Sequence, residues 1–167
     1  MNLGFAYLGS VEASVEQFDC GVLELNDFIQ REATRFVNQG LSAVKLLLDT
    51  NAGRIAGFYA ISPLCVQLRF LSAKQREQYS VPFPIPAWLI GRLAVDADYQ
   101  NQSLGGALLQ DAIDNIKKRA QNGAGALIIV DAKNKKVKRF YEKYGFHPLD
   151  SCGGMKLATP ISFSTCQ

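Results

Sequence analysis

Cysteine is scarce and scattered in this chain. Its 167 residues include 4 cysteines, Cys20, Cys65, Cys152 and Cys166, and no two of them form a C-x-x-C pair. This spacing suits neither a zinc site nor a disulfide framework, so we expect reduced thiols and no metal ligation. Cys20 and Cys65 stand in apolar surroundings, where burial as a small hydrophobic side chain is the expected role.

Long apolar runs are absent too. No run reaches the roughly 20 residues that a membrane helix needs. The start of a secretory signal carries basic residues, whereas no basic residue precedes Arg31 in this chain. We therefore expect a cytoplasmic protein that does not bind a membrane. The single histidine, His147, has no surroundings that favour a role as ligand or base.

The overall composition is that of an ordinary globular protein. Hydrophobic residues make up 48% of the chain and charged residues 20%, values that argue against a disordered or fibrous protein. At this length we expect a single domain, residues 1–167, with its own apolar core. The net charge of +3 is only mildly basic, so the position of the basic residues says more than their number.

Apolar periodicity divides the chain into helices and strands. Apolar residues recur at helical spacing from Val22 to Val37, whereas Ala126 to Val130 is apolar throughout, as in a buried strand. The order strand, helix, strand around residue 105 implies a right-handed crossover between parallel neighbouring strands. The expected elements are a helix at 22–38, a hairpin of strands at 42–49 and 54–61 ended by Pro63, an irregular segment at 64–86 with a short helix at 72–79, a strand at 87–95, a helix at 105–121, a strand at 126–130, a helix at 135–144 and closing strands at 156–163. This order predicts a mixed α/β sheet with helices on both faces.

Two motifs carry the chemistry. The strand that ends at Asp96 continues through a turn of small and polar residues into a helix, which places free backbone N–H groups and a helix dipole at one point. Such a point is a natural seat for a phosphate. Downstream, Phe140 to Phe146 reads Phe-Tyr-Glu-Lys-Tyr-Gly-Phe.

Together these motifs resemble those of the GNAT N-acetyltransferases, over about residues 18–161. The resemblance implies the GNAT fold, a central and mostly antiparallel sheet with a splayed parallel strand pair at the cofactor site. It also implies acetyl-CoA as cofactor, with one strand pairing its main chain with the pantetheine and a Gln/Arg-x-x-Gly-x-Gly/Ala loop wrapping the pyrophosphate. The cofactor-binding residues implied are Leu93, Ala94, Val95, Gln100, Asn101, Gln102, Ser103, Leu104, Gly105, Gly106 and Asn134.

The loop departs from the family pattern at two positions. Ser103 replaces a glycine, and Asn101 stands where small or basic residues are common. Glycine is favoured where the backbone needs a positive φ or a close approach to a ligand, so we expect weaker acetyl-CoA binding than with glycine. For Asn134 two roles stay open: a pantetheine or substrate contact, or the N-cap of the following helix.

Acetyl transfer needs a neutral amine, a stabilised oxyanion and a proton for the departing thiolate. An α-amino group titrates near pH 8, so a strong base is unnecessary. The resemblance implies Tyr141 as proton donor, with Tyr144 as the rival, although the Phe140/Tyr144 pair is expected to pack against the sheet. Backbone N–H groups near Leu93 to Val95 would meet the oxyanion if a bulge breaks the ladder there.

Three further segments, Phe18–Ile29, Ile55–Ser62 and Ile85–Asp96, are similar to those of GNAT toxins from bacterial type II toxin–antitoxin modules. That resemblance implies acetylation of the α-amino group of aminoacyl-tRNA, a block of translation, a ribbon-helix-helix antitoxin as partner and a homodimer.

Basic residues gather around Tyr141, with Glu142 as the one acid among them. Such a cluster can neutralise tRNA phosphates and make binding salt-dependent, although a solvated helix face or a contact to the CoA phosphates would look the same. The expected RNA-binding residues are Arg92, Lys133, Lys135, Lys136, Lys138 and Arg139, with Lys143 in the same cluster.

Two other functions are compatible with these motifs. One is a GNAT acetyltransferase of a small amine or a protein N-terminus with no toxicity. The other is a degenerate GNAT domain that binds a partner without turnover, an interpretation encouraged by Ser103 and Asn101.

Overall fold

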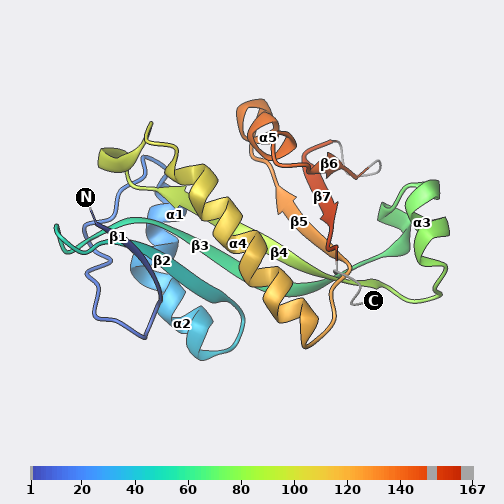
Figure 1. Cartoon of the computed structure of the whole chain (residues 1–167), viewed down its shortest axis with the longest axis horizontal. Helices are drawn as coiled ribbons and strands as arrows, with labels where there is room; N and C mark the ends of the chain where they lie inside the picture. The colour runs from blue at the N-terminus through green and yellow to red at the C-terminus, as the bar shows by residue number, and fades with distance from the viewer. Residues whose placement is uncertain (1, 150–153, 163–167) are drawn as a thin grey trace. The chain divides into compact units, whose positions relative to one another are not determined.

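The computed structural model describes residues 2–149 and 154–162, which form two compact units. Unit one comprises residues 1–62 and 91–112, and unit two comprises residues 63–90 and 113–167. The strands, in chain order (Figure 1), are β1 Leu3–Tyr7, β2 Ala43–Asp49, β3 Arg54–Val66, β4 Ile85–Val95, β5 Leu127–Asp131, β6 His147–Pro148 and β7 Lys156–Pro160. The helices are α1 Leu23–Asp27, the π-helix η1 Phe28–Glu32, α2 Ala33–Asn38, the 3-10 helix η2 Leu68–Phe70, α3 Ala73–Tyr79, the 3-10 helix η3 Ala97–Tyr99, α4 Leu104–Gln121 and α5 Lys135–Glu142.

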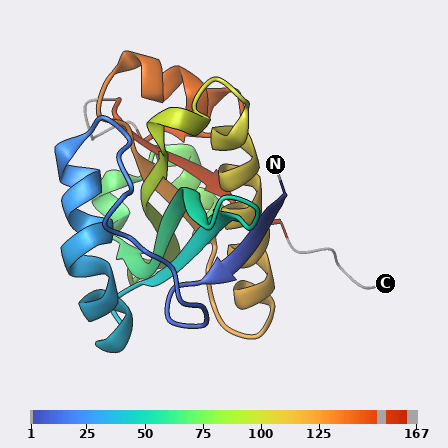
Figure 2. The ribbon, with the colours of Figure 1, turned by 90° about the vertical axis from the view of Figure 1, so that its left-hand side faces the viewer.

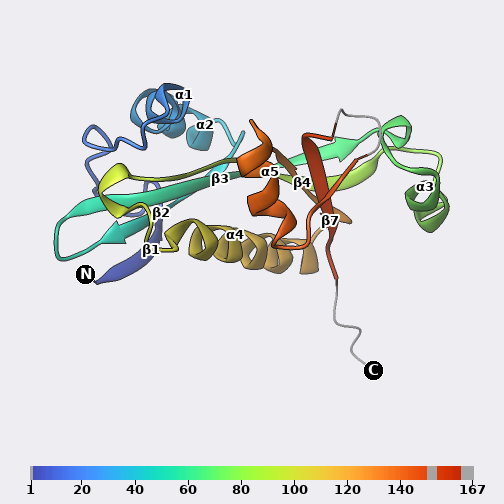
Figure 3. The same ribbon diagram turned by 90° about the horizontal axis from the view of Figure 1, so that it is seen from above.

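Hydrogen bonding orders the strands β1-β2-β3-β4-β5-β7-β6. In unit one, β2 pairs antiparallel with both β1 and β3, as the predicted hairpin requires. The helices α1 and α2 cover one face of these strands, and the first half of α4 covers the other (Figures 2 and 3). Under α1 and α2, the Phe58 ring lies 5.3 Å from that of Phe18 and 6.0 Å from that of Phe28, centroid to centroid. The helices pack on the sheet through this aromatic core.

In unit two, β4 and β5 pair in parallel, and β7 pairs antiparallel with both β5 and β6. The predicted parallel neighbours and the mixed sheet are therefore confirmed. The core of this unit gathers buried side chains from β4, β5 and β7, including Ile85, Leu127 and Ala158. Helix α3 begins with a reciprocal cap, in which Ser72 and Gln75 each accept the other's backbone N–H.

The structure differs from the prediction at β3 and at β1. Strand β3 runs through Pro63 to Val66 instead of ending at residue 61. Pro63 is exposed, and a proline is tolerated in a strand where no ladder N–H is needed. Strand β1 was not predicted, because its residues are half-exposed and include Gly4, which weakens the apolar alternation.

Two other predictions need correction or fall outside the described residues. Cys65 is exposed, because the end of β3 leaves it on the surface, whereas Cys20 is buried as expected. Cys152, Cys166 and Phe163, the last residue of the expected closing strands, lie outside the described residues.

Residues 2–149 and 154–162 include no helix that is both long and apolar enough to cross a membrane. In the same part of the chain, no group of three or more His, Cys, Asp or Glu side chains could hold a metal ion.

A glycine at residue 57 lets β3, β4 and α4 approach closely in unit one. A Cβ built there would lie 2.7 Å from Leu108 Cδ1 and 2.8 Å from the Ala94 carbonyl oxygen. We expect Gly57→Ala to lower the free energy of unfolding by about 1–3 kcal/mol in urea titrations, because backbone and helix must both shift. Gly4→Ala is the control, since a Cβ at Gly4 meets nothing within 4 Å. Equal stability of the two variants would contradict this packing.

Candidate active site

A buried carboxylate fixes the end of β4. Asp96 directly follows the strand and is 2% exposed. One of its carboxylate oxygens accepts the backbone N–H of Asp19 at 3.0 Å, and the other accepts that of Asp98 at 3.1 Å and lies 3.4 Å from the Arg54 guanidinium. The Asp96 N–H donates to the Ala56 carbonyl at 3.0 Å. The carboxylate thus sets where the strand ends and the turn begins.

The segment around Asp19 holds this turn from the other side. The Asp19 carbonyl accepts the N–H of Ala97 at 2.8 Å, and its carboxylate accepts the Gly21 N–H at 2.8 Å and the Asn26 amide at 2.7 Å. The hydrogen bond from Gly21, followed by that from Asn26, lowers the pKa of the Asp19 carboxyl. Asn26 also accepts the Cys20 N–H at 2.9 Å. The Cys20-Gly21…Asn26 motif therefore has a structural role, which sequence spacing alone did not reveal.

The Gln100 side chain belongs to the same network. Its amide nitrogen donates to the Cys20 carbonyl at 3.1 Å and to the Val95 carbonyl at 3.0 Å. The Gln100 side chain therefore stabilises the turn. The groups that remain for a ligand in this part of the loop are backbone groups.

The amide loop, residues 100–105, presents free backbone N–H groups from residue 101 onward. Asn101 and Ser103 adopt left-handed conformations, with φ of 61° and 60°. None of the N–H groups of residues 101–105 donates to another described residue, and α4 begins at Leu104. A row of free amides at the N-terminus of an 18-residue helix suits an anion with several oxygens, such as a pyrophosphate.

The parallel ladder between β4 and β5 stops short of the end of β4. Its last paired residues are Ile90 and Val130, whereas β4 continues to Val95. Leu93 and Val95 are half-buried and Ala94 is buried. Pairing with β5 therefore ends before residues 91–95, where β5 itself ends at Asp131, and a splayed strand pair stays a prediction. The register shift that the structure describes lies between β2 and β3 at Leu47/Leu48, so an oxyanion-binding bulge near Leu93 to Val95 stays a prediction.

Arg92 on β4 stacks on an aromatic ring. Its guanidinium carbon lies 3.8 Å from the centroid of Phe28 and 5.6 Å from that of Phe36. Phe28 opens the π-helix η1, a feature often found near functional sites. Arg92 is half-buried and forms no ion pair with a described carboxylate, so its N–H edge stays available to an anion.

Asn134 and Tyr141 lie at the two ends of α5 in unit two. The Asn134 side chain accepts the Val137 N–H at 2.9 Å, so its N-cap role is present; a pantetheine contact stays a prediction. Tyr141 is 6% exposed, and its ring lies 5.3 Å from that of Phe140 and 5.7 Å from that of Phe146. Burial, and then the charge of Asp131, raises the pKa of Tyr141 to about 12.

The Tyr141 hydroxyl is not sealed in the interior. It forms no hydrogen bond with the described residues, yet no polar side-chain atom among them is both shielded from solvent and unpartnered. The hydroxyl therefore reaches solvent while its ring stays buried. Asp131, whose charge acts on the phenol, is itself paired with Lys156 at 2.5 Å.

The basic residues of α5 are mostly in solvent. Lys138 is half-buried, whereas the others are exposed, namely Lys133, Lys135, Lys136, Arg139 and Lys143. Tyr144 is 39% exposed and its ring lies 5.3 Å from that of Phe140, so the expectation that this pair packs against the sheet is wrong for Tyr144. Helix α5 ends before this residue, and the ring is left on the surface.

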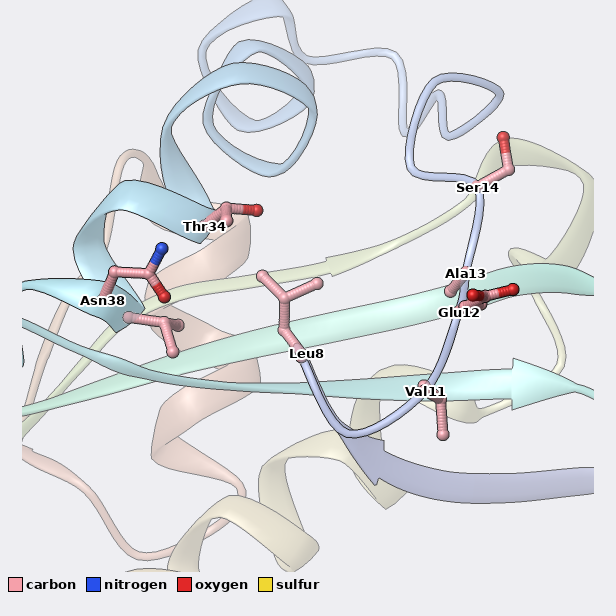
Figure 4. A pocket seen from close by; sticks show the side chains of 9 residues that line it. Leu8, Val11, Glu12, Ala13, Ser14, Thr34 and Asn38 are labelled. Carbon is pink, nitrogen blue, oxygen red and sulfur yellow. The ribbon is translucent and has the colours of Figure 1, made fainter.

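A cavity of about 470 Å³ opens elsewhere in unit one. Its lining comes from the loop after β1 and from α2, with Leu8 facing Thr34 and Asn38 (Figure 4). None of the predicted site residues lines it.

The chain belongs to the GNAT acetyltransferase family. The family model described as acetyltransferase (GNAT) domain matches residues 42–148, which include both the amide loop and Tyr141. The protein is therefore an N-acetyltransferase, and its cofactor is acetyl-CoA. The free amides of the amide loop fit the pyrophosphate of that cofactor.

A relative and two solved structures show which kind of acetyltransferase this chain is similar to. A tRNA-acetylating toxin of Mycobacterium tuberculosis (strain ATCC 25618 / H37Rv) is 32% identical over 132 residues, which cover 79% of this chain and 77% of that protein. AtaT complexed with acetyl-methionyl-tRNAfMet is 25% identical with a TM-score of 0.85, covering 95% of both chains. A variant of AtaT bound to the C-terminus of the antitoxin AtaR and acetyl-CoA is 24% identical with a TM-score of 0.80, covering 95% of this chain and 93% of that one.

The left-handed backbone at Ser103 should limit what can replace it. We expect Ser103→Val to lower the free energy of unfolding by about 1–2 kcal/mol and to weaken CoA binding, because a β-branched residue fits a positive φ poorly. Ser103→Gly should bind CoA at least as tightly as the natural chain. Urea unfolding and calorimetry measure both. Ser14→Val is the control, since Ser14 is exposed and has no positive φ. Normal CoA affinity in Ser103→Val would contradict the strain.

The raised pKa of Tyr141 predicts a loss of stability in alkali. The folded pKa of about 12 exceeds the unfolded value near 10, so the folded state loses up to about 3 kcal/mol relative to the unfolded state as pH rises from 10 to 12. Below pH 10 this contribution is fully present. Tyr141→Phe should remove this part of the pH dependence in denaturant titrations. Parallel curves for the natural chain and Tyr141→Phe across pH 9–12 would show that the pKa is not raised.

Proposed function

We propose that this chain is a toxin that acetylates the α-amino group of aminoacyl-tRNA and thereby blocks translation. The observation that carries the proposal is its 32% identity, over 79% of its length, to a tRNA-acetylating toxin. The position of the phenol at the end of α5 and the basic surface of that helix support it.

Acetyl-CoA supplies the activated acetyl thioester. The main chain of Leu93, Ala94 and Val95 binds the pantetheine and meets the developing oxyanion, because this stretch of β4 is unpaired by β5. The amide loop, residues 100–105, binds the pyrophosphate, and Gly106 follows in the first turn of α4. The substrate amine attacks as a neutral nucleophile, for which its ordinary pKa near 8 suffices.

Tyr141 acts as proton donor to the sulfur. With a pKa of about 12 its hydroxyl is protonated at neutral pH, so it donates a hydrogen bond and does not serve as a base. A phenol of this pKa does not give up its proton downhill to a thiolate whose thiol titrates near 8.5. The step is balanced by the nitrogen, which must lose a proton as the amide forms: the phenol passes its proton to the sulfur as the carbon–sulfur bond breaks and takes up the proton that the nitrogen releases.

The RNA contacts come from basic side chains. Lys135, Lys136 and Arg139 are exposed and form no ion pair with a described carboxylate, so their charge is available to phosphates. We assign the same role to Lys133 and Lys138, and to Arg92 through the guanidinium edge that its stacking on Phe28 leaves open. Asn134 contacts the pantetheine or the substrate while it caps α5.

The partners follow from the same class. We propose a ribbon-helix-helix antitoxin as inhibitor and a homodimer as the working form, with the cytoplasm as the compartment because charged tRNA is found there. The left-handed amide loop retains the conformation that the family's glycines favour, which argues against a degenerate, non-catalytic domain.

The experiment is incubation of bulk charged tRNA with labelled acetyl-CoA, followed by identification of the labelled aminoacyl adenosine. We expect transfer to the α-amino group, and we expect Tyr141→Phe to lower kcat about 10²- to 10⁴-fold with little change in the affinity for acetyl-CoA. Tyr79→Phe is the matched control. Burial raises the pKa of Tyr79 as well, but this tyrosine lies on α3 and not on α5.

Two results would contradict the proposal. If labelled acetyl groups appear on a small amine or a protein N-terminus and not on aminoacyl-tRNA, the substrate is wrong. If Tyr141→Phe turns over like the natural chain, the assigned proton donor is wrong.

A further inference from the structure

Tyr144 is an exposed aromatic residue at the end of a basic helix. Its side chain is 39% exposed, and its ring is supported by that of Phe140, 5.3 Å away at an interplanar angle of 55°. Phe140 in turn contacts the Tyr141 ring at 5.3 Å. The three rings therefore form one continuous cluster, of which Tyr144 is the outermost member.

The backbone holds Tyr144 in place although its ring is in solvent. Its N–H donates to the Tyr141 carbonyl at 2.9 Å, and the next N–H, of Gly145, donates to the Glu142 carbonyl at 3.1 Å. Gly145 has a φ of 84°, which ends the helix with a left-handed turn. The Phe146 N–H returns to the Tyr141 carbonyl at 3.3 Å. Tyr144 is thus fixed relative to Tyr141 by the turn that ends α5.

Exposed basic residues stand close to Tyr144 in the sequence. Lys143 precedes it and Arg139 lies one helical turn before that residue, both exposed, with Glu142 as the nearby acid. The Tyr144 hydroxyl forms no hydrogen bond with the described residues, so the ring itself is what this position offers. An exposed aromatic ring between cations is the surface that binds unpaired nucleobases, since bases stack on the ring while phosphates meet the charges.

We propose that Tyr144, supported by Phe140, stacks on the unpaired terminal nucleobase of the RNA substrate. The inference rests on the proposed function and specifies it. In an aminoacyl-tRNA the amino acid is esterified to the ribose of the terminal nucleotide, so that nucleotide's base must lie near the reacting amine. A stacking surface fixed three residues from Tyr141 is where such a base would need support.

Steady-state kinetics on aminoacyl-tRNA test the stacking. We expect Tyr144→Ala to raise KM for the RNA about 5- to 150-fold with kcat nearly unchanged. Tyr144→Phe and Tyr144→Trp should keep the natural KM, because each retains an aromatic face. This rescue separates stacking from a general loss of folding.

The salt dependence of KM provides a second readout. Lys143→Gln removes a cation, so the slope of log KM against log salt should fall by about 0.7–0.9 for each phosphate that is no longer neutralised. Tyr144→Ala should leave that slope unchanged, since it removes no charge. A changed slope in Tyr144→Ala, or an unchanged KM, would overturn the assignment.

A binding measurement separates this inference from the proposed function. The probe is an uncharged RNA hairpin with a single-stranded 3′ end carrying 2-aminopurine as its last base, whose fluorescence falls on stacking. We expect quenching by the natural chain and by Tyr144→Phe, and not by Tyr144→Ala. If aminoacyl-tRNA is not acetylated but quenching follows this pattern, the stacking stands and the proposed reaction fails.

The opposite result overturns the stacking alone. If aminoacyl-tRNA is acetylated while Tyr144→Ala quenches the probe like the natural chain, Tyr144 does not support the base. The same holds if Tyr144→Ala weakens inhibition by a protein partner and leaves both RNA measurements unchanged, because the ring would then belong to a protein interface.

Discussion

The buried carboxylate of Asp96 is the interaction on which the amide loop depends. A carboxylate that is 2% exposed is costly unless its oxygens are satisfied, and here backbone N–H groups of Asp19 and Asp98 and the Arg54 guanidinium satisfy them. Those partners come from segments far apart in the sequence. Because a single side chain collects them, the end of β4 and the turn at Asp98 are held against the Asp19 segment, directly before the free amides.

In this arrangement, side chains hold the turn and backbone N–H groups remain free. Gln100 and Asn26 use their side chains to brace the turn, so the ligand-facing part of the loop consists of backbone N–H groups. Backbone groups do not depend on residue type, provided that the residue accepts the required φ. That is why a loop with Asn101 and Ser103 can present the same amides as one built from glycine, at the cost of local strain.

Much of the fold could be predicted from the sequence, because α4 and the parallel pair β4 and β5 have strong local periodicity. The same local logic missed the continuation of β3 past Pro63, since only the surrounding structure shows that a proline is tolerated there. In the site, the motifs located the amide loop and Tyr141. They did not reveal the hydrogen bond between Asp19 and Asp96, which joins residues 77 positions apart, nor the stacking of Arg92 on Phe28, because neither depends on spacing along the chain.

Tyr141 and Tyr144 show how environment assigns different chemistry to one residue type. Tyr141 lies in the last turn of α5 and Tyr144 in the turn that follows, and both contact Phe140, so sequence alone made them rivals for the same role. Burial and the charge of Asp131 raise the pKa of Tyr141, so its hydroxyl is protonated at neutral pH. Tyr144 is exposed, and the group that it presents is the face of its ring and not a buried hydroxyl. In the roles proposed for them, the two tyrosines present a proton donor and an aromatic surface three residues apart, in a segment rich in exposed cations, which suits a substrate whose reacting amine is carried on a nucleotide.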